Sequence, residues 1–205
     1  PFAMGTTVAF IYGIAMFGST YLLPLYLQLG LGLSPSYVGT LLLPSGLLLA
    51  LTIAVVGRYS STHPTHLMVS FGLVLLALSF ALMLSVNLQT GLWVLVVFAI
   101  LGRVGLGFIL PSLNIGAMRG MDGSLIPQGA SVINFLRMLG GAAGVSLCGI
   151  LLEWRLAVHG DSLTNAKTSA MRLAAFDEVF LMLALVCMLA LLAAWRIRQP
   201  HPHTH

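Results

Sequence analysis

Long apolar runs alternate with short polar segments along the whole chain. Each run holds about 20 mostly apolar residues, which is the length that an α-helix needs to cross a hydrocarbon core of about 30 Å. We therefore predict six transmembrane helices, over residues 2–28, 37–56, 67–86, 92–117, 128–152 and 177–195.

The apolar runs favour helices over a membrane β-barrel. Barrel strands would appear as alternating segments of about ten residues, whereas these runs are continuous and about twice as long. Pro24, Pro44 and Pro111 lie inside runs, where membrane helices tolerate them. The predicted fold class is an all-α integral membrane protein.

We expect one six-helix domain over residues 1–199. Six spans divide into three and three, and transporter halves are often built as such inverted repeats, although no internal sequence repeat is visible here. In residues 200–205, His201, His203 and His205 alternate with Pro and Thr, which is compatible with metal binding. We favour a disordered tail for this segment.

Composition supports a membrane protein and excludes several other classes. Of the 205 residues, 59% are hydrophobic and 7% are charged, whereas a soluble domain carries about 25% charged residues. The net charge of +4 comes from scattered Lys and Arg without a basic stripe, so nucleic acid is excluded as a partner. Cys148 and Cys187 lie in apolar runs and are interpreted as small apolar residues.

Basic residues in the polar segments predict the orientation in the membrane. An even number of spans places both termini on one side. The segments on that side contain Arg58, Arg119, Arg196 and Arg198, and those on the other side contain Arg155, Lys167 and Arg172. By the positive-inside rule the first set, and with it the C-terminus, is predicted to be cytoplasmic. The protein is expected in the inner (plasma) membrane.

The chain starts at Pro1 and enters an apolar run almost at once. It shows neither the basic segment nor the small-residue cleavage site of a signal peptide. We expect the chain to be a fragment whose true N-terminus is missing.

Acids and histidines lie outside the centres of the predicted spans. All five acids are assigned to loops or helix edges: Asp122, Glu153, Asp161, Asp177 and Glu178. Proton-coupled transporters usually relay protons through acids or histidines inside the membrane, so no relay is predicted in this chain alone. A membrane serine protease or metal hydrolase would also need histidines inside the spans, so we predict no enzyme, no cofactor and no metal.

Two positive charges lie inside predicted spans. Arg103 is eleven residues after Leu92, and Arg137 is about nine residues into the fifth run. A charge at this depth must face a cavity or a partner, so each is either a cavity-lining cation or a structural residue bonded to neighbouring helices. Other residues inside the spans have two similar interpretations, as cavity-lining or as packed side chains: Tyr12, Phe17, Tyr21, Asn114 and Asn134.

Small residues cluster in the fourth and fifth runs. Gly140 and Gly144 have the spacing of a small-xxx-small contact, and Gly105 and Gly107 belong to a similar cluster. Small side chains let helix backbones approach closely, so helix packing is the predicted role. The string Gly105-Leu106-Gly107 is not a dinucleotide fingerprint, because no strand precedes it.

These motifs resemble those of one family. The run Gly102 to Gly107, followed by Pro111, resembles the fourth C-domain helix of fourteen-span drug:proton antiporters of the major facilitator superfamily, the EmrB/QacA type. Motifs in the other runs also match: Tyr21 to Gln28, Ser34-Pro35, Gly39, Leu43-Pro44, Gly129-Ala130-Ser131, Asn134-Phe135, Arg137, Gly140-Gly141-Ala142, Arg155, His159 and Leu163.

The resemblance implies that the chain holds spans nine to fourteen of such a transporter. The N-terminal domain, with the usual proton-coupling acids and half of the cavity, would then be absent. The resemblance also implies a cytoplasmic C-terminus and a cavity lined by the first and fourth helices of this half. These helices carry Tyr12, Phe17, Tyr21, Arg103 and Asn114.

One segment departs from the family pattern. Gly57-Arg58 begins what resembles the cytoplasmic loop signature, which usually continues with an Asp, a Gly and a second basic residue. Ser61, Pro64 and His66 stand in those places. The charge pairing that this loop supplies in the family is therefore not expected here.

The resulting hypothesis is half of a proton-driven exporter of amphipathic or cationic small molecules. Its partners would be the lipid bilayer, the missing N-terminal half and the substrate. A homodimer of two such halves is an alternative within the same fold. Another is a non-transporting membrane scaffold or the remnant of a truncated transporter gene.

Overall fold

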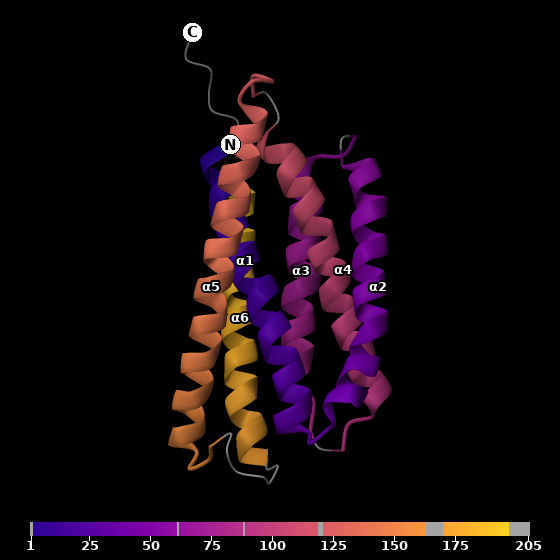
Figure 1. The fold of residues 1–205 in the computed structure, drawn as a ribbon, viewed down its shortest axis with the longest axis vertical. Coiled ribbons are helices and arrows are strands. Elements are labelled where there is room, and N and C mark those ends of the chain that lie inside the picture. The colour runs from indigo at the N-terminus through magenta and orange to yellow at the C-terminus, as the bar shows by residue number, and fades with distance from the viewer. Residues whose placement is uncertain (1, 61, 88, 119–120, 163–169, 197–205) are drawn as a thin grey trace.

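The computed structural model describes residues 2–60, 62–87, 89–118, 121–162 and 170–196. Within these ranges the chain forms six long helices that run side by side (Figure 1), and each is long and apolar enough to cross a membrane. The helices are α1 (Phe2–Leu25), continued by the π-helix η1 (Tyr26–Gly30), α2 (Pro35–Tyr59), α3 (Thr65–Met83), α4 (Leu92–Ala117), α5 (Ile126–Val158) and α6 (Ala170–Arg196). The predicted all-α membrane fold is confirmed.

Several residues named above lie outside the described ranges. These are Ser61 of the loop signature, Leu163 of the family match, the basic residues Arg119, Lys167 and Arg198, and the whole tail 200–205. The prediction of a disordered tail therefore stays a prediction.

Proline and serine define the boundary between the first two helices. Pro24 cannot donate a backbone hydrogen bond, and two residues later the chain changes to π-helical bonding, in which Leu31 N donates to Tyr26 O at 3.1 Å. Gly32 follows with φ 76°, a conformation that glycine adopts without strain. Ser34 then caps α2 by accepting from Tyr37 N at 3.3 Å, with Pro35 in the first helical position.

The fifth and sixth helices are longer than the hydrophobic pattern predicted. α5 continues to Val158 instead of ending near residue 152, and α6 begins at Ala170 instead of Asp177. At 1.5 Å per residue α5 spans about 50 Å, well beyond a hydrocarbon core, so its polar last turns remain helical outside the apolar zone. Asp177 and Glu178, predicted at the first positions of the sixth helix, consequently lie about two turns inside α6.

The helix contacts have an internal two-fold pattern. The contact of α1 with α5 corresponds to that of α4 with α2. The contact of α3 with α4 corresponds to that of α6 with α1. In addition, α1 contacts α4, and α3 contacts α6. Exchanging α1, α2 and α3 with α4, α5 and α6 reproduces these contacts, and matched helices run in opposite directions (Figure 1). The contact between α5 and α6 has no comparable counterpart between α2 and α3. This is the arrangement of a 3+3 inverted repeat, as expected from six spans, although no internal sequence repeat is visible.

Glycines allow the closest helix contacts. A Cβ on Gly140 would collide with the Phe10 carbonyl, and one on Gly144 would lie 2.6 Å from the Ile14 carbonyl oxygen, so the backbones of α1 and α5 nearly touch. A Cβ on Gly105 would lie 2.7 Å from the Gly72 carbonyl oxygen of α3. On α4, a Cβ on Gly107 would lie 2.6 Å from Thr52 Cγ2 of α2. Small side chains thus permit these helix pairs to form.

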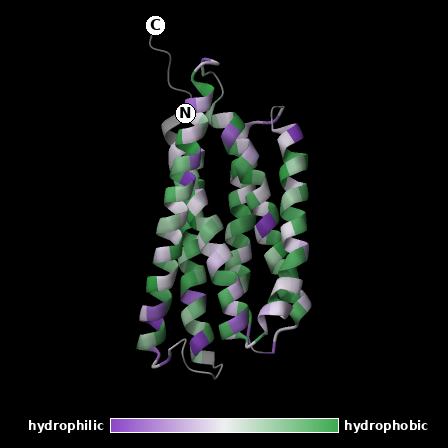
Figure 2. Ribbon diagram, in the orientation of Figure 1, coloured by the Kyte–Doolittle hydropathy of each residue, from purple (hydrophilic) through white to green (hydrophobic). Residues whose placement is uncertain are grey.

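Much of the outer surface is apolar. α2 exposes one row of large side chains at intervals of four residues: Leu43, Leu47, Leu51, Val55 and Tyr59. Figure 2 shows hydrophobic residues along the length of the helices and most hydrophilic residues near the helix ends. A surface of this kind is stable in contact with lipid.

Candidate functional site

Arg103 lies near the middle of α4 and reaches across to α1. Its Nη1 donates to Thr20 Oγ1 at 3.1 Å, and the Thr20 hydroxyl donates in turn to the Met16 carbonyl at 2.7 Å. The Arg103 side chain is half-buried. A guanidinium at mid-depth is therefore held by a neutral hydroxyl group.

Arg137 of α5 contacts the same part of α1. Its Nη2 donates to Asn134 Oδ1 at 2.6 Å, and its Nη1 lies 3.9 Å from Met16 Sδ. Its Cζ lies 6.0 Å from the centre of the Phe17 ring, which is the range of a cation–π contact. Every one of these groups is uncharged.

Tyr12 links the surroundings of the two arginines. Tyr12, Met16 and Thr20 follow one another at intervals of four residues, so they lie along one face of α1. The Tyr12 side chain is 1% exposed, its phenol lies within electrostatic range of both guanidinium groups, and its hydroxyl has no hydrogen-bond partner among the described residues. We call Tyr12, Thr20, Arg103, Asn134 and Arg137, together with Met16 and Phe17, the mid-membrane cluster.

No carboxylate belongs to the mid-membrane cluster. All five acids of the chain lie in the described ranges, and the salt bridges found there are Arg155–Glu178, His159–Glu178 and Arg172–Asp161. Neither Arg103 nor Arg137 takes part in one. In the described part of the chain, the two positive charges of the cluster thus face neutral dipoles and an aromatic ring.

Two of the predicted cavity residues lie away from this cluster. Asn114 is half-buried on α4, eleven residues after Arg103 and on nearly the same face, which places it about 16 Å further along the helix. Tyr21 is exposed on α1, and its hydroxyl lies near Gly149, far along α5 from Arg137. The structure therefore joins Tyr12, Phe17, Arg103, Asn134 and Arg137, and leaves Asn114 and Tyr21 apart.

Sequence reasoning missed Thr20 and Met16, which hold the two guanidinium groups. The available signal was their spacing from Tyr12 at four and eight residues along one helix face. Neither residue type is unusual in a membrane helix, so this spacing alone would not have distinguished them.

A second polar cluster lies at the end of the bundle where α5 ends and α6 begins. Arg155 donates to Glu178 through Nε, and through Nη2 at 3.1 Å, while His159 Nε2 hydrogen-bonds the same carboxylate at 3.2 Å. Arg172 is 1% exposed and donates to Asp161 Oδ2 at 2.9 Å and to the Leu29 carbonyl at 2.9 Å. We call these residues the end cluster.

The predicted loop signature lies at the other end of the bundle. Gly57 and Arg58 are exposed at the end of α2, and nothing lies within 4 Å of a Cβ placed on Gly57. His66 is half-buried beside a small cavity of about 60 Å³ between α1, α3, α4 and α6. Within the described ranges, no salt bridge joins Arg58 to His66.

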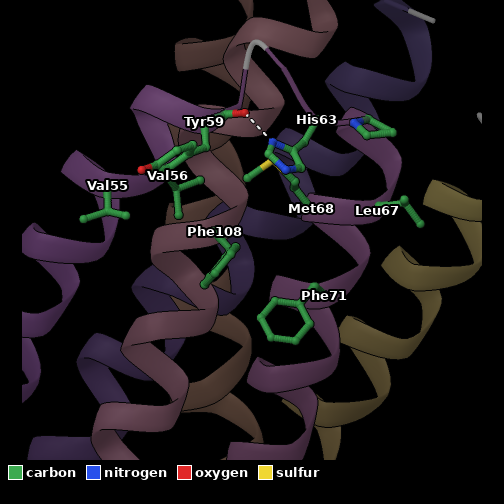
Figure 3. A pocket seen from close by; sticks show the side chains of 9 residues that line it. Val55, Val56, Tyr59, His63, Leu67, Met68, Phe71 and Phe108 are labelled. Atoms are coloured by element: carbon green, nitrogen blue, oxygen red, sulfur yellow. Dashed lines mark hydrogen bonds between the residues drawn. The ribbon is translucent and has the colours of Figure 1, made fainter.

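An apolar groove of about 490 Å³ lies near this end, between α2, α3 and Phe108 of α4 (Figure 3). Its lining residues are Val55, Val56, Tyr59, His63, Pro64, Leu67, Met68, Phe71 and Phe108. His63 Nδ1 hydrogen-bonds the Tyr59 carbonyl at 2.9 Å, and Tyr59, Leu67 and Phe71 are exposed side chains of the outer surface. None of these residues belongs to the mid-membrane cluster.

Comparison with known proteins identifies the family. The family model described as Major Facilitator Superfamily matches residues 1–145, which include α1 to α4 and more than half of α5. The chain belongs to the Major Facilitator Superfamily. It is accordingly a multi-pass membrane protein of a transporter family, and not an enzyme.

Individual relatives are resistance and efflux proteins. The chain is 26% identical over 200 residues to the methylenomycin A resistance protein of Streptomyces coelicolor, covering 96% of this chain and 38% of that protein. It is 24% identical to the lincomycin resistance protein LmrB of Listeria innocua, covering 71% and 31%. It is also 24% identical to the multidrug transporter protein MdtP of Bacillus subtilis, covering 77% and 29%. The chain thus matches two fifths or less of each relative's length.

Proposed function

We propose that this chain is the C-terminal half of a small-molecule efflux transporter and that the mid-membrane cluster forms part of its substrate site. The observation that carries the proposal is the pair of guanidinium groups at mid-depth, facing α1 and bonded only to neutral groups. Charges at this depth are costly and are typical of substrate pathways.

The relatives support a role in export. Two of the three are named for resistance to an antibiotic, and the third is named as a multidrug transporter. Resistance by a membrane transporter is achieved when the compound is moved out of the cell. A drug or another amphipathic small molecule is therefore the proposed substrate, and the lipid bilayer is the surroundings in which it is bound.

The six helices are proposed to work with a second set supplied by the rest of the transporter. Matches that cover 29–38% of the relatives support this reading, as does the family resemblance to fourteen-span drug:proton antiporters of the EmrB/QacA type. Alternating access would come from rocking of the two halves around the site at the membrane midplane. Because the mid-membrane cluster has no carboxylate, the proton-coupling acids are proposed to lie in the other half.

The orientation follows the basic residues. The exposed Arg58 lies at the same end of the bundle as the start of α1 and the end of α6, which supports a cytoplasmic C-terminus in the plasma membrane. The altered loop after Arg58 lacks the usual acid of the family signature. Other contacts would therefore have to hold the inward-facing or outward-facing state.

Drug-susceptibility and dye-efflux assays in a pump-deficient bacterium test the proposal. The complete transporter that contains this segment is compared with the segment alone, each as wild type, as Arg103→Ala and as the matched control Arg58→Ala, with membrane amounts measured by immunoblot. Export by the complete protein that falls with Arg103→Ala and not with Arg58→Ala is expected.

The other outcomes separate the alternatives. Export by the segment alone would indicate a homodimer of two six-helix units and would overturn the half-transporter proposal. Absence of export from both proteins, each present in the membrane, would support a non-transporting scaffold or a gene remnant.

A further inference from the structure

We propose that the mid-membrane cluster selects amphipathic organic anions, whose carboxylate binds at Arg103 while the apolar part lies along α1. This inference rests on the proposed function, because it names the substrate class of the same site. It narrows the sequence-based expectation of an amphipathic or cationic substrate to amphipathic anions.

The charge balance of the cluster is the first argument. Arg103 and Arg137 both act on the face of α1 that carries Tyr12, and all five acids of the chain are bonded or placed elsewhere. A bound anion would supply the charge that the cluster lacks, in a region of low dielectric where such an interaction is strong. A cation would instead meet two like charges.

Unused hydrogen-bond donors are the second argument. A guanidinium carries five N–H donors in a planar fork, which matches a carboxylate in a bidentate pair. Among the described residues, Arg103 makes one hydrogen bond, through Nη1 to Thr20. The Nε and Nη2 groups of this half-buried side chain therefore remain available to a ligand.

The orphaned phenol of Tyr12 is the third argument. Its hydroxyl is buried and without a hydrogen-bond partner in the described part of the chain, although it lies one turn from Met16 and within electrostatic range of both arginines. Buried polar groups are normally bonded, so an unbonded hydroxyl here fits a site that a ligand or its water completes. A hydroxyl donor also favours an anionic acceptor.

The aromatic ring of the cluster does not serve a cation. Organic cations are commonly bound on aromatic faces, but the Phe17 ring already has the Arg137 guanidinium at 6.0 Å. Phe17 and Met16 instead offer apolar surface beside the charges, which suits the hydrocarbon part of an amphiphile. The cluster thus combines an anion-binding end with a neighbouring apolar surface.

The test uses two surfactants with the same chain and opposite charge. Cells that express the complete transporter are loaded with radiolabelled dodecanoate or dodecyltrimethylammonium, and efflux is measured for wild type, Arg103→Lys, Arg103→Gln, Arg103→Glu and the control Arg58→Gln. Dodecanoate export is expected for wild type, with a loss of about tenfold or more in Arg103→Gln, because charge-assisted hydrogen bonds are removed. Partial export is expected for Arg103→Lys, which keeps the charge without the planar fork.

Charge reversal is the sharpest part of the experiment. Arg103→Glu is expected to abolish dodecanoate export and to improve export of dodecyltrimethylammonium relative to wild type. Size-exclusion profiles of the purified variants identify any that fail to fold, and Arg137→Gln then serves as the second charge-removing variant.

Each remaining outcome overturns the inference. Wild-type export of dodecyltrimethylammonium without dodecanoate, or dodecanoate export that is unchanged by every charge variant, would show that the cluster does not select anions. Export of a neutral antibiotic with neither surfactant would also overturn it while leaving the proposed transporter function intact. Absence of any export would overturn the proposed function itself.

Discussion

Two pairs of arginines in this protein have opposite surroundings. At the end where α5 meets α6, Arg155 and Arg172 each face a carboxylate, and Arg172 also binds the Leu29 carbonyl. At mid-depth, Arg103 and Arg137 face a hydroxyl, an amide, a thioether and an aromatic ring. The first pair completes its charge balance within the chain, and the second does not.

This difference separates structural charges from functional ones. A charge that is paired inside the chain stabilises one arrangement of the helices, and removal of its partner leaves an uncompensated buried charge. A charge without an opposite partner destabilises the folded state, so its position needs another reason. We therefore expect variants of the end cluster to change stability and variants of the mid-membrane cluster to change transport.

The largest expected effect is in Arg172→Ala. The substitution leaves Asp161, whose side chain is 11% exposed, without its guanidinium partner, and it also removes the bond to the Leu29 carbonyl at the end of η1. The cost of breaking such a buried pair is about 3–5 kcal/mol. Thermal unfolding of the purified protein in detergent measures it, with the exposed Arg58→Ala as a control that should match wild type.

The next largest effect is expected at the close contact between α1 and α5, which we expect to position Arg137. Gly140→Ala places a Cβ against the Phe10 carbonyl and should force α1 away from α5, at a cost of about 1–3 kcal/mol. Transport should fall together with stability, because Met16 and Phe17 on α1 would lose contact with Arg137. The same change at Gly39, which faces open space on α2, should leave stability unchanged or raise it.

A smaller effect is expected from Glu178→Gln in the end cluster. Its side chain is 34% exposed, so solvent screening limits the loss of the Arg155 and His159 bonds to about 1 kcal/mol or less. High salt should reduce the difference from wild type. A much larger loss in thermal unfolding would indicate that Arg155 depends on Glu178 as strongly as Arg172 depends on Asp161.

The smallest change in stability is expected for Arg137→Gln. The bonds to be lost join Arg137 to Asn134 and Met16, which are neutral, and removal of an unbalanced charge offsets them. The free energy of unfolding should stay within about 0.5 kcal/mol of wild type, while substrate export falls. A strong loss of stability with intact export would show that Arg137 is structural. The distinction between a structural end cluster and a functional mid-membrane cluster would then be wrong.

Some features of the site were readable from the sequence. Arg103 and Arg137 stood out because charges are rare inside apolar runs, and the glycine spacing of Gly140 and Gly144 indicated helix contact. The start of the sixth helix was predicted too late, at Asp177, because hydropathy falls in the preceding segment, which contains Arg172. A helix can continue beyond the lipid, and α6 starts seven residues earlier, at Ala170.

The sequence by itself determined the number of spans, the helical class and the depth of the two mid-membrane charges. These features depend on local chain length and on the cost of leaving a backbone or a charge unsatisfied in lipid. Only the tertiary structure decided that Thr20 meets Arg103, that Met16 and Phe17 meet Arg137, and that Asp161 and Glu178 are used elsewhere. Those contacts join segments far apart in the chain, so they follow from how the helices pack and rotate and not from any local pattern.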